Sequence, residues 1–237
     1  MLRPGLAVVS SVVLLSISSC VPPSIVRAVA AGNPGCVYEI PRPDKVVALT
    51  LDDGPDSTTT PELLKILAAN NARATFFLIS GHLAGNDTLV TRLVSEGHEI
   101  GNHFSRNEAS IGLRHRDFVR SFLTADSALR KFSPLRWVRP GSGHYNKRMI
   151  RTFTQHGYRC ALGSVYPFDP QIPVSAYSTW VIRRNVRPGA IIILHDGGYK
   201  GRNTIKTLNT LLPDLRRDGY QVVTLTELTA PARAKTE

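Results

Sequence analysis

The sequence has 237 residues and lacks the signatures of several large protein classes. It contains no G-x-G-x-x-G or Walker loop, so no nucleotide site is indicated. Its three cysteines are too few for a disulfide-rich scaffold, and the lack of an internal repeat or low-complexity tract argues against a solenoid. With 42% apolar residues, the chain is long and apolar enough to bury one sizeable core.

The N-terminal segment, residues 1–30, differs from the rest of the chain and is typical of an export signal. After Arg3, the apolar run from Leu6 to Ile17 is too short to span a bilayer comfortably and resembles a secretory signal core. Ala28-Val29-Ala30 would form a cleavage site, whereas Ile17-Ser18-Ser19-Cys20 resembles a bacterial lipobox whose lipidated Cys20 would anchor the protein to a membrane. A transit peptide is a third alternative. We therefore expect a secreted or cell-envelope protein.

The formal net charge is +11 at pH 7, from 29 basic and 18 acidic side chains. Such a charge favours an anionic wall polymer, a membrane surface or a nucleic acid as partner, or it serves solubility alone. The basic residues are scattered and form no nucleic-acid motif, so we expect no nucleic-acid partner. We also expect the protein to be a monomer. If Cys20 is removed or lipidated, Cys36 and Cys160 remain, and in an oxidising compartment they either pair or stay separate thiols.

Apolar, strand-like stretches alternate with helix-like stretches from residue 45 onward. The expected strands cover 45–51, 74–79, 98–102, 135–138, 158–162, 190–194 and 220–225, and the expected helices cover 60–70, 87–96, 117–132, 146–156 and 204–217. This alternation predicts an α/β fold, a distorted (β/α) barrel with about seven parallel strands in a single domain, with an open doubly wound sheet as the alternative. We expect an extended lead-in over 31–44, the folded domain over 45–229 and a flexible tail over 230–237.

Two adjacent carboxylates, Asp52 and Asp53, directly follow the first expected strand. Neighbouring acids repel each other and are costly to desolvate together, so a fold tolerates them best where one binds a positive centre and the other exchanges protons. Because Gly54-Pro55 comes next, an ordinary solvated turn is the alternative interpretation.

Polar clusters follow later strands at a similar place, and they favour the functional interpretation. These clusters are Asn102-His103, Arg139-Pro140-Gly141-Ser142-Gly143, Asp169 and His195-Asp196. The carboxyl ends of barrel strands share one face, so the clusters are expected to converge with the two aspartates. A single histidine after a strand is more often structural, but several polar clusters in register indicate a catalytic site.

These motifs resemble those of the polysaccharide deacetylase family, the NodB-homology domain of carbohydrate esterase family 4. The resemblance covers about Val46 to Leu228. The family motifs T-F-D-D-G-P, R-P-P-Y-G and I-x-L-H correspond to Thr50-Leu51-Asp52-Asp53-Gly54-Pro55, to the looser match Arg139-Pro140-Gly141-Ser142-Gly143, and to Ile192-Ile193-Leu194-His195. The resemblance implies metal-assisted removal of an N-acetyl group from an amino sugar.

The resemblance also implies individual catalytic roles. Asp52 would be the general base and His195 the general acid, and Arg139 would orient Asp52 through a charged hydrogen bond. Asp169 would correspond to the acid that tunes the catalytic histidine, although Pro170 stands where the family usually has Trp. The expected substrate contacts are Leu194, which would line a pocket for the acetyl methyl group, and Ser142, Gly143 and Tyr145.

The metal site departs from the family pattern. Asp53 and His103 would bind a divalent metal, Zn²⁺ or alternatively Co²⁺, but the family's H-[ST]-x-x-H motif reads His103-Phe104-Ser105-Arg106-Asn107 here. A neutral amide oxygen is a poor Zn²⁺ ligand beside imidazole. Asn107, the neighbouring Glu108 or a water could complete the shell, or the metal could be lost.

The sequence therefore favours a metal-dependent deacetylase acting on N-acetylated glycans, either chitin-like chains or peptidoglycan. Two alternatives remain open. The Asn107 position suits a catalytically weak, deacetylase-like carbohydrate-binding protein, and a closed pocket would suit an amidohydrolase of a small non-sugar amide.

Overall fold

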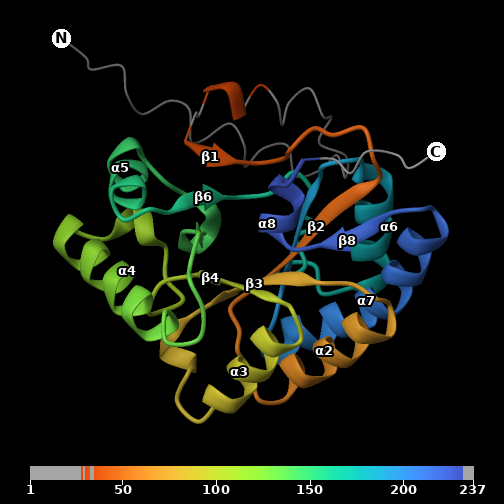
Figure 1. Ribbon diagram of the computed structural model, residues 1–237, viewed down its shortest axis with the longest axis horizontal. Coiled ribbons are helices and arrows are strands. Elements are labelled where there is room, and N and C mark those ends of the chain that lie inside the picture. Colours follow the sequence, from red (N-terminus) through yellow and green to blue (C-terminus); the bar gives the residue numbers. More distant parts are fainter. Residues whose placement is uncertain (1–27, 29, 33–34, 232–237) are drawn as a thin grey trace.

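The structure is a computed structural model that describes residues 28, 30–32 and 35–231. Most of the expected signal segment, including Cys20, and the tail from residue 232 onward lie outside the described residues. Helices surround a central curled sheet (Figure 1). None of the helices formed by the described residues combines the length and the apolar character needed to cross a membrane.

Strands and helices alternate along most of the chain. The strands are β1 (Cys36–Val37), β2 (Val46–Asp52), β3 (Ala74–Leu78), β4 (Glu99–Asn102), β5 (Trp137–Val138), β6 (Arg159–Ala161), β7 (Ile191–His195) and β8 (Gln221–Val223). The α-helices are α2 (Thr59–Ala69), α3 (Asp87–Ser95), α4 (His115–Leu129), α5 (Lys147–Gln155), α6 (Ser175–Asn185), α7 (Gly198–Arg217) and α8 (Leu225–Thr229). Short 3₁₀ turns are η2 (Ser80–His82), η3 (Ser110–Gly112) and η4 (Gly141–Gly143).

The strands form one parallel sheet in the order β1-β6-β5-β4-β3-β2-β7, with β8 paired to the start of β2. The sheet curls until the chain just after β6 meets β7. Val165 forms a parallel bridge with Ile192, and the Ile193 amide donates to the Val165 carbonyl at 2.9 Å. The distorted parallel barrel predicted from the sequence is thus confirmed, and this short bridge closes it.

Strand β2 lies at the centre of the fold and is buried on both faces. Val47 and Leu49 pack under the surrounding helices, while Val46 and Ala48 belong to a second core cluster inside the barrel with Phe77 and Trp137. Burying each large apolar side chain fully contributes roughly 1.5–3 kcal/mol. Both faces of β2 are therefore covered by apolar cores, which explains its continuous apolar run. Because side chains alternate along a strand, Thr50 and Asp52 lie on the same face as Val46 and Ala48, toward the barrel interior.

The amino ends of the strands are covered by helix α8. The Glu99 carboxylate accepts hydrogen bonds from the Thr75 hydroxyl at 2.8 Å, from the Thr226 amide at 3.1 Å and from the Thr226 hydroxyl. The Trp137 indole donates to the Thr226 hydroxyl at 3.0 Å, and Leu228 joins the interior apolar cluster. Because this end is filled, the carboxyl ends of the strands form the mouth of the barrel.

Some element boundaries differ from the sequence-based expectation. Helix α6 was not expected, because its β-branched and aromatic residues lower helix propensity and only packing against α7 reveals it. Helix α7 begins at Gly198 rather than at residue 204. The last strand ends at Val223 because Thr224 and Glu227 form a capping box that starts α8.

Cys36 and Cys160 form a disulfide. The two residues are direct partners in the β1–β6 register, so the pairing left open by the sequence is decided in favour of a bond. The lead-in is also held at the barrel by the Ile40 amide, which donates to the Gly189 carbonyl at 2.9 Å. The lead-in thus forms a strand and packs against the domain.

Candidate active site

Side chains from several strand ends gather at the mouth of the barrel. They are Asp52 and Asp53 at the end of β2, His103 after β4, Arg139 after β5, Asp169 after β6 and His195 at the end of β7. Asp52 and His195 are direct partners in the β2–β7 register. The structure therefore brings together the residues for which the sequence predicted catalytic roles.

Asp52 is paired with a buried guanidinium. Arg139 Nη1 donates to Asp52 Oδ1 at 2.6 Å and to the Thr50 hydroxyl at 2.9 Å, and the guanidinium lies 4.2 Å from the Phe77 ring centroid. Its Nε and Nη2 donate to the carbonyls of residues 161 and 162, both at 3.0 Å. Since Arg139 is only 2% exposed and Asp52 only 4%, this charged hydrogen bond is shielded from water.

Asp53 and His103 face each other as a pair of potential metal ligands. Asp53 Oδ1 lies 3.5 Å from His103 Nε2. His103 Nδ1 lies 2.7 Å from the Arg139 carbonyl, so Nδ1 carries the proton that it donates, and Nε2 is the ring nitrogen that faces Asp53. One carboxylate oxygen and one imidazole nitrogen in this arrangement fit a divalent metal.

The third ligand position is not filled by an acid or a second histidine. Asn107 is exposed on the loop after β4, and the backbone of the next residue, Glu108, lies against Gly141. Within residues 28, 30–32 and 35–231, no group of three or more His, Cys, Asp or Glu side chains is placed to hold a metal ion. The protein thus offers two ligands where its sequence suggested the possibility of three.

A lysine that the sequence analysis did not single out also reaches this pair. The Lys200 ammonium, from the first turn of α7, forms an ion pair with Asp53 Oδ2. Burial alone would raise the pKa of the Asp53 carboxyl, but hydrogen bonds and charges from His103 and Lys200 lower that pKa below its ordinary value. Burial likewise opposes protonation of His103, yet the charges of Asp52 and Asp53 raise the pKa of its imidazole. Asp53, His103 and Lys200 are thus electrostatically coupled.

Strained backbone aims the two metal-ligand candidates. Asp53 has φ 74° and Phe104, directly after His103, has φ 67°, a region in which side-chain-bearing residues are uncommon. The Phe104 ring is fully buried among Phe118, Phe122 and Phe153, and its amide donates to Asn102 Oδ1 at 2.8 Å. Core packing therefore holds the His103 turn in a conformation that it would not adopt alone.

His195 is oriented by a buried acid. Its Nδ1 lies 3.0 Å from Asp169 Oδ1, and its backbone amide donates to Asp169 Oδ2 at 3.1 Å. Asp169 is fully buried, and its carboxylate accepts the proton on His195 Nδ1. This leaves His195 Nε2 for the mouth. The position of Asp169 beside the histidine agrees with the role expected for it, even with Pro170 next to it.

The residues expected to contact substrate are placed less uniformly. Ser142 is exposed and Gly143 half-buried on the η4 turn just after Arg139, whereas the Tyr145 hydroxyl lies 2.8 Å from the Tyr38 hydroxyl. Leu194 is fully buried in the core between the sheet and the helices and presents no surface to a ligand. An acetyl pocket lined by Leu194, as expected from the sequence, would need a rearrangement that this structure does not show.

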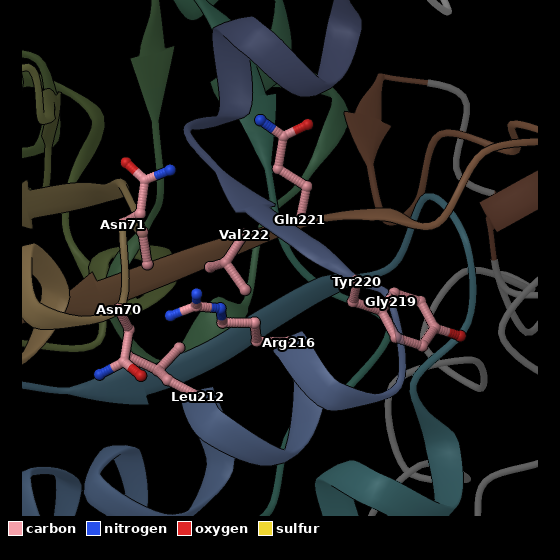
Figure 2. A pocket seen from close by; sticks show the side chains of 9 residues that line it. Asn70, Asn71, Leu212, Arg216, Gly219, Tyr220, Gln221 and Val222 are labelled. Carbon is pink, nitrogen blue, oxygen red and sulfur yellow. The ribbon is translucent and has the colours of Figure 1, made fainter. Parts of the chain in front are cut away.

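A surface hollow of about 340 Å³ lies away from these residues. It is bordered by the end of α2, the end of α7 and the start of β8, with Asn70, Arg216 and Gln221 among its lining side chains (Figure 2). The hollow is at the amino ends of the strands and contains none of the predicted site residues. Barrel enzymes perform their chemistry at the opposite end, so this hollow is not the candidate active site.

Asp196 links the mouth of the barrel to helix α2. It accepts hydrogen bonds from the Thr59 hydroxyl at 2.6 Å, from the Thr60 hydroxyl and from the Gly197 amide at 2.7 Å, and its own amide donates to the Asp52 carbonyl at 2.7 Å. Burial raises the pKa of Asp196 to about 6, although these three donors favour the ionised form. Asp196 thus helps to position the turn that carries Asp52.

Sequence reasoning missed further contacts at the site. His82 Nδ1 lies 2.9 Å from the Asp53 carbonyl, and the Thr50 hydroxyl accepts from Arg139 and donates to the Ile192 carbonyl at 2.7 Å. Lys200 carried no signal of its own in a chain with many basic residues. Lys200 lies five residues after His195, and two glycines stand between them. Such a glycine pair after a strand could have indicated a turn into a helix at the mouth of the barrel.

Comparisons with known proteins identify proteins with similar sequences and folds. A family model described as polysaccharide deacetylase matches residues 39–161. A peptidoglycan-N-acetylglucosamine deacetylase of Bacillus cereus is 35% identical over 196 residues, which cover 81% of this chain and 91% of that protein. A chitooligosaccharide deacetylase of a Bradyrhizobium species is 31% identical, covering 77% of this chain and 90% of that protein. The solved structure of the Bc1960 peptidoglycan N-acetylglucosamine deacetylase superposes with a TM-score of 0.79 at 25% identity, covering 90% of this chain and all of that one.

The raised pKa of Asp196 predicts a pH-dependent stability. Its folded-state pKa of about 6 exceeds the value of about 4 expected in the unfolded chain, so the folded state binds the proton more tightly. The free energy of unfolding should therefore fall as pH rises from about 4 to about 6, by at most about 3 kcal/mol from this group. Urea unfolding of wild type and Asp196→Asn across this range measures the contribution. A difference between the two proteins that stays constant with pH would contradict it.

Proposed function

Because the chain belongs to the polysaccharide deacetylase family, we propose that it removes N-acetyl groups from amino-sugar polymers. Members of this family are hydrolases that act on carbon–nitrogen bonds other than peptide bonds. One observation carries the proposal: a carboxylate held by Arg139 and a histidine held by Asp169 share one mouth with the Asp53–His103 pair. Base, acid and cation site are thus available together.

Asp52 accepts the proton from the attacking water in this proposal. Its Oδ1 is bound by Arg139, and no hydrogen bond from the described residues occupies Oδ2, which leaves one oxygen for the water. Because Arg139 is itself fixed by Thr50 and by the carbonyls of residues 161 and 162, the carboxylate cannot rotate freely. Such a positioned base contributes about 10²–10⁴-fold to rate.

His195 delivers a proton to the amine that leaves. Asp169 accepts the Nδ1 proton, so Nε2 is the nitrogen that exchanges protons at the mouth. Asp169 also favours the imidazolium that forms while the histidine holds the extra proton. The acid and the base occupy adjacent strands in register, so they can act on opposite sides of one acetamide group.

We further propose that Asp53 and His103 hold a divalent metal, Zn²⁺ or Co²⁺. When bound, such a metal would polarise the acetamide carbonyl and acidify a water. The support from this chain is the facing Oδ1 and Nε2 atoms and the hydrogen bond that fixes the His103 tautomer. Waters or the substrate would complete the coordination, since Asn107 is exposed and uncharged.

A wall polymer such as peptidoglycan is the substrate class that the observations favour. The Bacillus cereus relative named for peptidoglycan is 35% identical and covers most of the chain. The Tyr166 ring lies 6.0 Å from His195 and 4.7 Å from Phe168, and aromatic rings beside a catalytic histidine suit a sugar ring. The charge of +11 suits an anionic polymer.

Export of the protein is part of the same proposal. The signal-like N-terminus supports it, with Cys20 as a possible lipid anchor, and the Cys36–Cys160 disulfide is of the kind expected in an oxidising compartment. Peptidoglycan and chitin-like chains lie outside the cytoplasm, so the location and the substrate class agree.

A weakly active glycan-binding protein is the second candidate, and two observations favour it. The third ligand position lacks a strong donor, and Lys200 already pairs with Asp53. The intact Asp52–Arg139 and His195–Asp169 pairs favour catalysis instead, since binding alone requires neither a base nor an acid.

Asp52→Asn should lower acetate release from chitin oligomers and peptidoglycan by at least about 10²-fold, because the amide cannot accept the proton from water. The Asn side chain can still accept the Arg139 hydrogen bond, so the far-ultraviolet circular dichroism should match wild type. Activity close to that of wild type would refute the assignment of the base. A wild-type protein that binds both polymers and releases no acetate from either would support the second candidate.

Asp169→Asn should lower kcat on the order of 10²-fold with little change in KM, because the Asn NH₂ group can donate to Nδ1 and so hold His195 in the wrong tautomer. The matched variant is His195→Gln, and the double variant should be no slower than His195→Gln alone, since the two residues act as a unit. Additive losses in the double variant would show that Asp169 acts elsewhere.

Chelation should remove acetate release, and added Zn²⁺ or Co²⁺ should restore it, because the carbonyl then loses and regains its Lewis acid. The measurement is acetate release before chelation, after it and after stepwise metal addition. Full activity of exhaustively metal-free protein would exclude the metal from the proposed mechanism.

A further inference from the structure

The two oxygens of Asp53 have different neighbours. Oδ1 faces His103 Nε2 at 3.5 Å, whereas Oδ2 is paired with the ammonium of Lys200. We propose that Lys200 is the resident counter-ion of Asp53 and that it competes with a divalent metal for this carboxylate. This inference rests on the proposed metal use at the Asp53–His103 pair.

The fold fixes the point from which Lys200 reaches the site. Gly197 and Gly198 adopt φ of 83° and 52°, so the chain turns sharply from β7 into α7. The Gly198 amide donates to Asp56 Oδ2 at 3.2 Å, and a Cβ on Gly201 would lie 2.6 Å from the Thr59 hydroxyl. Because α7 starts in close contact with α2, a metal can displace Lys200 only if its side chain swings away.

The ion pair is mostly shielded from solvent. The Lys200 side chain is 18% exposed and that of Asp53 is 8% exposed. Water and salt weaken charge interactions much less at such a site than at the surface. Removing the ammonium without a replacement would leave the buried carboxylate with one charge partner fewer, which is costly.

The two ion pairs beside the metal-ligand candidates balance their own charges without a metal. Arg139 pairs with Asp52, and Lys200 pairs with Asp53. A divalent ion added to this set gives an excess of two positive charges, whereas one added in the absence of the Lys200 ammonium gives an excess of one. The metal therefore meets direct repulsion from Lys200 as well as competition for Oδ2.

Replacing Lys200 should thus tighten metal binding. Zn²⁺ is titrated calorimetrically into metal-stripped protein without substrate, using wild type, Lys200→Met, Lys200→Arg and the charge-matched control Lys206→Met, an exposed residue of the same helix. We expect Lys200→Met to lower the Kd at least about tenfold, equivalent to ~1.4 kcal/mol. Lys200→Arg keeps the positive charge and Lys206→Met lies outside the site, so both should stay close to wild type. A Kd for Lys200→Met no lower than that of Lys206→Met would overturn the proposal.

A stability measurement keeps the test decisive if a variant is poorly folded. In chelator, Lys200→Met and the more polar Lys200→Gln should melt at lower temperature than wild type, and Zn²⁺ should raise their Tm more than that of wild type. Failure of both variants to gain stability from Zn²⁺ would contradict competition. The readouts do not involve substrate, so absence of acetate release from every metal-loaded protein would contradict the proposed function and leave the competition measured on its own.

Discussion

The architecture of the site depends on one buried charge, the guanidinium of Arg139. An unpaired ion in a protein interior costs several kcal/mol, and this residue is only 2% exposed. Its donors are shared among the Asp52 carboxylate, the Thr50 hydroxyl and the carbonyls of residues 161 and 162. One side chain therefore connects β2, β5 and the end of β6 at the level where the strands open. The interaction that keeps the barrel mouth together is also the one that aims the proposed base.

The same coupling of folding to chemistry holds at the cation site. Asp53 and Phe104 have positive φ, and each such residue costs of the order of 1–3 kcal/mol that the surrounding structure must offset. At Phe104 the offset comes from aromatic packing against α4 and α5, and at the Asp53 turn from the Ile79 amide, which donates to the Gly54 carbonyl at 2.9 Å. His103 is then aligned by the Arg139 carbonyl. The core thus maintains a ligand geometry that the local sequence does not favour.

The sequence predicted most strands and the convergence of the site, because both follow from local patterns. Apolar runs end in polar residues, and parallel topology brings such ends together. It did not predict α6, whose residues favour strand locally, nor the start of α7 at Gly198, which depends on contact with α2. Asp169 was included among the converging polar clusters although it lies well after its strand, and its role beside the catalytic histidine was taken from the resemblance alone. Lys200 was missed because its partner, the Asp53 carboxylate, is distant in the sequence and comes close only in the folded structure.

Arg139 already neutralises Asp52, so Asp53 is the carboxylate that remains to attract a metal. The other proposed ligand, His103, would offer an imidazole nitrogen that adds no negative charge. Asn107, in register with the family's second histidine, adds neither charge nor a strong donor. Under the proposed competition, occupancy of the site would depend on which cation pairs with the single carboxylate of Asp53. Lys200, the competing cation in this proposal, lies on the first turn of α7, outside the strand-end motifs by which the site is recognised. Two proteins with identical motifs would therefore differ in metal affinity if they differ at this position.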